Sequence, residues 1–173
     1  MEKQTQVIDA SVVMKWFVEE EFTDKAVEIK ERYISGSLNI IVPELLFIEV
    51  INALRYKNNS EDKLIEINKS LWKMGFKVER VNEQLLNKAI TVAKKYDITI
   101  YDAIYVALAN LKGVFLITAD SELNKVSNVL PLSKTWRNKK KIFKRRNIKH
   151  RENQYKLIKS KIILILTKLF LNK

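Results

Sequence analysis

Four acidic residues, Asp9, Glu49, Asp102 and Asp120, lie in apolar sequence rather than in the polar runs that hold most other acids of the chain. Asp9 ends Val-Ile-Asp, and Glu49 lies within Leu-Leu-Phe-Ile-Glu-Val-Ile. Asp102 lies within Ile-Tyr-Asp-Ala-Ile-Tyr, and Asp120 follows Leu-Ile-Thr-Ala. A carboxylate rarely faces an apolar interior without a partner. If the four converge, they raise one another's pKa values, and a hard divalent cation is the natural compensation.

Mg²⁺ or Mn²⁺ suits such a set, because these ions prefer carboxylate oxygens and water and need no histidine or cysteine. The chain has no cysteine, and its single histidine, His150, lies near the C-terminus. This excludes disulfide scaffolds and thiol catalysis and argues against a Ser-His-Asp triad. A carboxylate-bound metal can activate water and stabilise a phosphoryl-transfer transition state, so the pattern predicts a metal-dependent nuclease.

Each aspartate also has a purely structural interpretation. Asp9 could cap the helix that follows it, with Ser11 as a competing cap. Asp120 could cap the segment after it, and Asp102 stands at capping-box spacing from Thr99. Taken singly, these residues leave cap and function open.

Three glycines mark the elements that would position these residues. Gly36, Gly75 and Gly113 each separate a helix-like pattern from a strand-like one, and glycine after a helix adopts left-handed backbone at little cost. Repeated helix–glycine–strand units predict an α/β fold, here a three-layer α/β/α sandwich with a central parallel sheet. Ligands of such sheets bind beyond the carboxyl ends of the strands, where Asp9 and Asp120 fall.

The hydrophobic pattern predicts strands and helices of ordinary length. The expected strands cover residues 5–9, 39–42, 77–81, 114–118 and 126–130. The expected helical segments cover residues 11–35 with a break at 19–21, 44–57 with Pro43 at the helix start, 61–74 capped by Ser60, 83–95, 100–112 and 120–125.

Positive charge is concentrated at the C-terminal end. The 173 residues carry 32 lysines and arginines against 20 aspartates and glutamates, a formal charge of +12. Residues 137–173 alone hold 14 of the basic residues and one acid. We therefore expect two parts, a nuclease-like domain at residues 1–133 and a basic C-terminal extension at residues 134–173.

Three roles for the extension stay open. It could bind RNA phosphates through basic residues, the candidates being Lys139, Lys140, Lys141, Arg145 and Arg146. Its amphipathic end, from about residue 156, could lie on an anionic membrane or pack on a partner. It could also be a solvated addition without a role. The N-terminus lacks the apolar core of a signal peptide, so we expect a cytoplasmic protein.

Four blocks of the sequence resemble the PIN-domain family, in particular the VapC-type toxin ribonucleases of prokaryotic toxin–antitoxin pairs. These blocks are Val7–Phe17, Pro43–Leu54, Tyr101–Ala109 and Leu116–Asp120. The resemblance covers about residues 5 to 130. It implies that the acidic quartet binds one or two Mg²⁺ or Mn²⁺ ions for hydrolysis of RNA. It also implies a homodimer and a small antitoxin partner that blocks the site.

The resemblance singles out further side chains. Ser11 and Thr118 occupy its hydroxyl positions, which implies that they hold a carboxylate or a metal-bound water; helix capping is the alternative. Asn52 would orient Glu49 from one turn beyond it. Lys15 would face either phosphate or solvent.

The sequence therefore predicts a metal-dependent endoribonuclease of the toxin type, with Asp9, Glu49, Asp102 and Asp120 as catalytic and metal-binding residues. Two alternatives remain. One is a non-catalytic RNA-binding protein with a PIN-like fold, and the other is an RNA-processing nuclease outside a toxin–antitoxin system.

Overall fold

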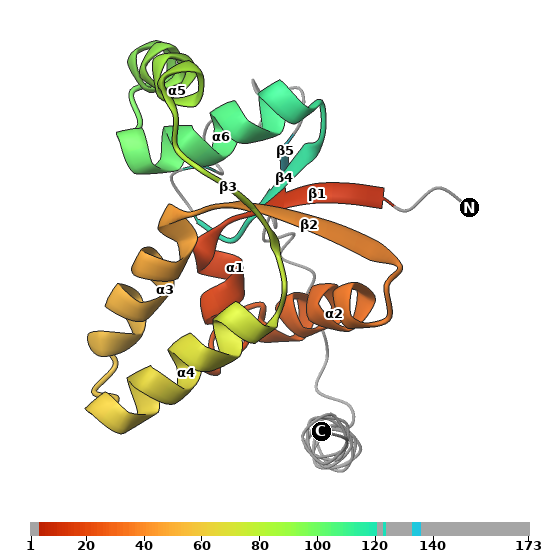
Figure 1. Ribbon diagram of the computed structural model, residues 1–173, viewed down its shortest axis with the longest axis vertical. Coiled ribbons are helices and arrows are strands. Elements are labelled where there is room, and N and C mark those ends of the chain that lie inside the picture. The colour runs from red at the N-terminus through yellow and green to blue at the C-terminus, as the bar shows by residue number, and fades with distance from the viewer. Residues whose placement is uncertain (1–3, 121–122, 124–132, 136–173) are drawn as a thin grey trace, which may run out of the picture. The chain divides into compact units, whose positions relative to one another are not determined.

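The computed structural model describes residues 4–120, 123 and 133–135 (Figure 1). The chain divides into two units, residues 1–137 and 138–173, and all described residues belong to the first. The strands are β1 (Gln4–Ile8), β2 (Leu38–Pro43), β3 (Lys77–Glu79), β4 (Phe115–Thr118) and β5 (Ser133–Thr135). The helices are α1 (Ala10–Met14), α2 (Thr23–Ile34), α3 (Leu45–Arg55), α4 (Glu61–Lys73), α5 (Glu83–Tyr96) and α6 (Ile100–Lys112).

The strands form one parallel sheet in the order β3-β2-β1-β4-β5. Helices α1 to α4 lie on one side of the sheet and α5 and α6 on the other (Figure 1). This arrangement confirms the predicted three-layer α/β/α sandwich. A parallel sheet covered on both faces needs apolar side chains on both, and Val7 and Ile8, which point to opposite faces of β1, are both fully buried.

Local signals define most helix ends. Ser60, Asn82 and Thr99 accept hydrogen bonds at the starts of α4, α5 and α6 from the backbone N–H groups three residues later. Gly113 ends α6 in the left-handed conformation, with φ of 65°. The predicted Ser60 cap and the helix break before α2 are confirmed.

The position of Pro43 differs from the predicted one. It is the last residue of β2 rather than the start of a helix, and it pairs in register with Glu79 of β3. The next residue, Glu44, donates its backbone N–H to the Glu79 carbonyl and accepts the Val81 N–H on its carboxylate, both at 3.0 Å. Because these bonds prolong the contact with β3, the helix begins only at Leu45.

Several predictions fall on residues that the structure does not describe. These are the strand at 126–130, most of the short helix at 120–125, and the basic extension beyond residue 135. Strand β5, which the hydrophobic pattern missed, pairs with β4 from residue 133 onward. The boundary between domain and extension stays a prediction. Within the described ranges, no helix is long and apolar enough to cross a lipid bilayer.

The topology brings distant segments to the carboxyl edge of the sheet. The parallel strands β1, β2 and β4 all end there, so the chain enters α1 and α3 from this edge. Helix α6 packs on β1, β2 and β4 and leads directly into β4. It therefore runs antiparallel to the strands, and its first residues lie at the same edge. Residues near 9, 49, 102 and 120 are thereby placed together.

Candidate active site

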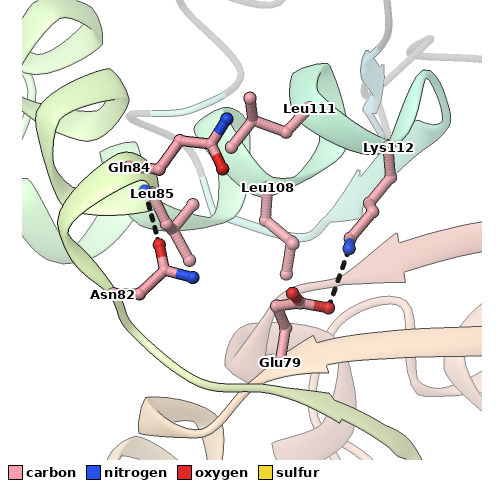
Figure 2. Close-up of a pocket in the computed structure, with 7 residues that line it drawn as sticks. All are labelled: Glu79, Asn82, Gln84, Leu85, Leu108, Leu111 and Lys112. Atoms are coloured by element: carbon pink, nitrogen blue, oxygen red, sulfur yellow. Dashed lines mark hydrogen bonds and ion pairs between the residues drawn. The ribbon is translucent and has the colours of Figure 1, made fainter.

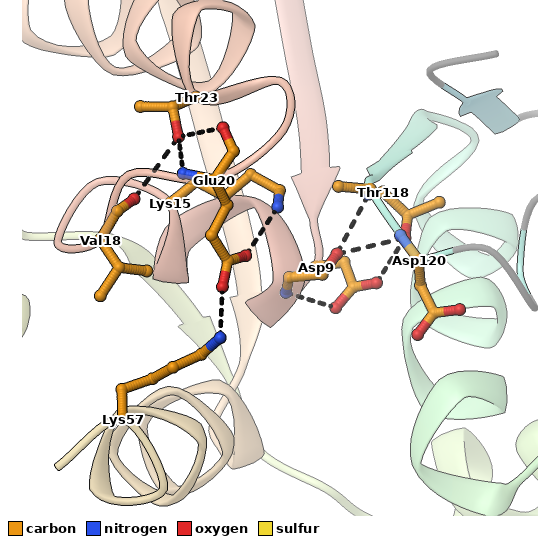
Figure 3. A network of polar contacts seen from close by, with 10 residues as sticks. Asp9, Lys15, Val18, Glu20, Thr23, Lys57, Thr118 and Asp120 are labelled. Carbon is orange, nitrogen blue, oxygen red and sulfur yellow. Dashed lines mark hydrogen bonds and ion pairs between the residues drawn. The ribbon is translucent and has the colours of Figure 1, made fainter. Parts of the chain in front are cut away.

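Asp9 lies at the centre of the carboxyl edge, between the end of β1 and the start of α1 (Figure 3). Its side chain is 6% exposed. One carboxylate oxygen accepts the Ser11 backbone N–H at 3.0 Å, which caps α1. The other accepts the Thr118 hydroxyl at 2.5 Å, across the pairing of β1 with β4. Asp9 is therefore both a helix cap and a buried acid facing the end of a neighbouring strand.

Two hydroxyl groups, those of Ser11 and Thr118, determine which atoms donate and which accept in this hydrogen-bond network. Thr118 Oγ1 donates its proton to Asp9 and accepts the Asp120 backbone N–H at 3.0 Å. Ser11 Oγ accepts the Ala119 N–H at 3.0 Å and lies 3.5 Å from Thr118 Oγ1. Because the Thr118 proton is committed to Asp9, Ser11 is the donor in that contact. The carboxylate of Asp9 is thus held in one orientation by groups from the start of α1 and the end of β4.

Asp102 lies in the first turn of α6 and is bound to the residue that caps that helix. Thr99 Oγ1 accepts the Asp102 N–H at 3.1 Å and donates to its carboxylate at 2.7 Å. Thr99 therefore caps α6 at the spacing that the sequence indicates, and its hydroxyl also bonds the Asp102 carboxylate. Asp102 is thus held at the start of α6, and its charge also raises the pKa values of Asp9 and Glu49.

Glu49 is half-buried in α3 and accepts a hydrogen bond from the Tyr105 hydroxyl of α6. Tyr105 is 1% exposed, and burial raises its pKa well above the usual 10, so it remains protonated and can donate. Sequence reasoning gave Tyr105 no role. The available signal was its spacing: Tyr105 stands three residues after Asp102, which puts both on one helix face.

In the described part of the chain, Asn52 does not form the hydrogen bond to Glu49 that its predicted role requires. It was expected to orient Glu49, yet its side chain is exposed and no hydrogen bond joins the two within the described residues. Glu49 faces α6, and Tyr105 of that helix makes the contact instead.

Burial and mutual repulsion shift two of these acids. The pKa of Asp9 rises to about 6, chiefly because the side chain is buried; the carboxylates of Asp120 and Asp102 add to the rise, and its hydrogen bonds partly offset it. The pKa of Glu49 rises to about 7, again chiefly through burial, with contributions from Asp9 and Asp102. Asp9, Glu49, Asp102 and Asp120 thus form one electrostatically coupled group, here called the carboxylate cluster.

A divalent cation fits the carboxylate cluster in donor type and in charge. Hard oxygen ligands suit Mg²⁺ and Mn²⁺, and a cation would reverse the repulsion that raises the pKa values of Asp9 and Glu49. Among the described residues, neither of these two acids forms an ion pair with lysine or arginine. Within the same residues, no three acids already stand at metal-binding spacing. The fit is therefore one of chemistry and charge, without a preformed chelate.

Lys15 is buried, and its ammonium group contacts Glu20 Oε2 at 3.0 Å (Figure 3). The other oxygen of Glu20 contacts the ammonium group of Lys57 at 2.7 Å. These bonds lower the pKa of Glu20, the contact with Lys57 most. Lys15 therefore faces a carboxylate rather than solvent, which corrects one of its two predicted settings. Its proposed phosphate contact stays untested.

The Glu20 contacts link α1, which Asp9 caps, to α3, which contains Glu49. Lys15 is the C-cap of α1, and Lys57 follows the end of α3. The loop that presents Glu20 is itself closed by Thr23, whose hydroxyl accepts the Glu20 N–H at 2.8 Å and donates to the Glu20 carbonyl at 2.9 Å. Lys15, Glu20 and Lys57 thus form a bridge between α1 and α3, named here the Glu20 bridge.

A separate pocket lies away from the carboxylate cluster, beside β3, α5 and α6 (Figure 2). An ion pair between Lys112 and Glu79, 2.9 Å long, lies along it. It contains no member of the carboxylate cluster; its lining consists of Glu79, Asn82, Gln84, Leu85, Leu108, Leu111 and Lys112.

Fold and site together define a parallel α/β/α domain with acids gathered at the carboxyl edge of its sheet. The chain belongs to the PIN domain family, whose model matches residues 7–129.

Known proteins similar to this chain agree with that assignment. Ribonuclease VapC3 of Pyrobaculum aerophilum is 34% identical over 123 residues, which cover 68% of this chain and 90% of that protein. A toxin–antitoxin complex from Klebsiella pneumoniae has the same fold, with a TM-score of 0.57 at 15% identity, over 75% of this chain and 96% of that one. Mycobacterium tuberculosis VapC20, a toxin that cleaves the sarcin–ricin loop, also has a TM-score of 0.57 at 15% identity, over 70% and 95% of the two chains.

Replacement of Asp9 by asparagine is expected to stabilise the protein when divalent ions are absent. The folded-state pKa of about 6 exceeds the ordinary 3.8, so the charged carboxylate costs stability above pH 6, and this cost disappears as the pH falls toward 4. Asp9→Asn should raise the free energy of unfolding at pH 7.5 by up to about 3 kcal/mol, with a smaller gain at pH 4.5. Urea denaturation in EDTA measures both values. Glu28→Gln, an exposed acid of α2, is the control, and a gain that does not shrink at low pH would contradict the assignment.

Replacement of Glu20 by glutamine should destabilise the fold, because buried Lys15 then lacks a charged partner. We expect a loss of about 1–3 kcal/mol in the free energy of unfolding. The adjacent exposed acid provides a matched control, and Glu19→Gln should change stability by less than about 0.5 kcal/mol. Equal urea midpoints for the two variants would show that the Glu20 bridge contributes nothing.

Proposed function

We propose that the chain is a metal-dependent endoribonuclease that acts as the toxin of a toxin–antitoxin pair. The observation that carries this proposal is the carboxylate cluster, in which acids from four separate segments are electrostatically coupled at the carboxyl edge of the sheet. A protein that only binds RNA gains nothing from a group of acids that repels phosphate. The 34% identity with a protein named as a ribonuclease supports the same conclusion.

We propose Asp9, Glu49, Asp102 and Asp120 as the ligands of Mg²⁺ or Mn²⁺. When bound, such an ion would polarise the attacking water and neutralise charge that develops on the scissile phosphate.

The chain's own residues set the geometry of those ligands. Thr118 and the Ser11 N–H restrain both oxygens of Asp9. Tyr105 restrains Glu49 from α6, and Thr99 restrains Asp102. Because their side chains are already restrained, these three carboxylates would lose little conformational entropy on binding an ion.

Structural neighbours include toxin–antitoxin complexes from Klebsiella pneumoniae and from Rickettsia felis, the latter with a TM-score of 0.55. By analogy, we propose a homodimer and a small antitoxin that covers the carboxylate cluster, with action in the cytoplasm. An antitoxin-like reading frame beside the gene would favour this role over RNA processing.

Asp9→Asn and Asp102→Asn are expected to abolish RNA cleavage, by at least about a hundredfold, because each removes one negative ligand while preserving side-chain shape. The assay incubates total cellular RNA with the purified protein in Mg²⁺, in Mn²⁺ or in EDTA. Circular dichroism verifies that both variants fold. Asp24→Asn, in the first turn of α2, is a control that should cleave normally.

Each other result of this assay has a definite meaning. Full activity of both variants would refute the assigned site. Retention of RNA by the wild-type chain without cleavage at any divalent-ion concentration would favour the non-catalytic alternative. Cleavage that persists in EDTA would refute the metal requirement.

We also propose that the basic extension contributes affinity for RNA that is independent of its sequence. Replacing Lys139, Lys140, Lys141, Arg145 and Arg146 by glutamine in the full chain should weaken RNA binding. If all five contact phosphate, the slope of log K against log salt should fall in magnitude by up to about 3.5. The control is the double variant Lys94→Gln and Lys95→Gln, which replaces two exposed residues of α5. An unchanged slope would leave the extension without a role in RNA binding, and a selective loss of binding to anionic vesicles would favour the membrane interpretation.

A further inference from the structure

Tyr101 is an exposed aromatic residue beside the carboxylate cluster. It immediately precedes Asp102 in the first turn of α6, and its side chain is 65% exposed. Within the described residues, Tyr101 makes no hydrogen bond and no ring contact. A large flat apolar surface is therefore presented to solvent next to an acid of the site.

The spacing along α6 shows where this surface lies. Residues four apart share a helix face, and helical side chains lean toward the N-terminus. Tyr105 lies four residues after Tyr101, is 1% exposed, and contacts Glu49. One helix stripe thus runs from a buried tyrosine that holds a carboxylate to an exposed tyrosine one turn nearer the helix start. Tyr101 therefore lies one turn from Tyr105 on the same face of α6 and precedes Asp102 in the chain, which places it near the edge of the carboxylate cluster.

An acidic site faces a particular difficulty with RNA, because its carboxylates repel the phosphates that it must approach. Attraction that does not depend on charge is therefore valuable at its rim. Aromatic side chains provide it by stacking on nucleobases, which contributes about 1–3 kcal/mol per base and tolerates any sequence. Bases of single-stranded RNA are free to leave their own stack for such a contact.

We propose that Tyr101 is a nucleobase-stacking residue, which binds a base of single-stranded RNA next to the scissile phosphate. This rests on the proposed function and adds a base-binding subsite to it. The contact requires the ring and not the hydroxyl group. It should therefore survive replacement by other aromatic residues and should disappear with alanine.

The chain offers a matched control in Tyr56. This tyrosine is 71% exposed, as open as Tyr101, but it lies at the far end of α3, seven residues beyond Glu49, about two helical turns away. The Arg55 guanidinium already lies over its ring, 4.7 Å from the centroid. General loss of exposed aromatic surface is thus separable from loss of stacking at the carboxylate cluster.

The test measures binding of two fluorescent 12-mers in EDTA, where hydrolysis cannot interfere. One is oligoadenylate, and the other is an abasic ribose-phosphate oligomer of equal length and charge. We expect Tyr101→Ala to weaken oligoadenylate binding by about five- to a hundredfold, while Tyr101→Phe, Tyr101→Trp and Tyr56→Ala bind as the wild-type chain does. The abasic oligomer should bind wild-type and Tyr101→Ala proteins equally.

The outcomes separate this proposal from the proposed function. Equal loss of affinity for both oligomers in Tyr101→Ala, or unchanged affinity for both, would overturn stacking while leaving the nuclease assignment intact. If the wild-type chain neither binds these oligomers nor cleaves cellular RNA, the proposed function itself fails and the subsite fails with it. Circular dichroism of each variant excludes unfolding as the cause.

Discussion

Repulsion among buried carboxylates at the carboxyl edge is the constraint on which the rest of the molecule depends. Asp9 loses hydration at the end of β1 and faces the charges of Asp102 and Asp120, and its pKa rises to about 6 as a result. Glu49 responds in the same way. A fold selected for stability alone would avoid this arrangement, so the cost of keeping it points to a purpose in binding positive charge. The apolar packing of the sheet, buried on both faces, offsets that cost.

Neutral hydroxyl groups orient three acids of the carboxylate cluster. Hydroxyl groups of Thr118, Thr99 and Tyr105 each donate to one member of the carboxylate cluster. A hydroxyl orients a carboxylate without cancelling its charge, so the capacity to bind a cation is retained. The nearby Lys15 is turned to Glu20 instead. The hydroxyl groups thus orient these acids without neutralising them, which leaves their negative charge for the divalent cation that we propose as the ligand.

The elements were largely predictable because their signals are local. Helix periodicity, three glycines with positive φ and side-chain caps such as Ser60 act over a few residues. Pro43 was placed wrongly because its setting depends on β3, which lies more than thirty residues away in sequence. Strand β5 was missed for a related reason: only three residues pair with β4, and so short a segment carries no periodic signal.

The sequence by itself indicated the four acids that the structure brings into electrostatic contact, the α/β class and the family resemblance, since apolar flanks and motif spacing are properties of the chain order. Only the tertiary structure decided which groups restrain those acids. Tyr105 rather than Asn52 contacts Glu49, and Lys15 joins the Glu20 bridge. The reason is physical: α3 meets α6, and the end of α1 meets the end of α3, only after the sheet has ordered its strands. Contacts between helices of different layers are set by packing, and no spacing along the chain encodes them.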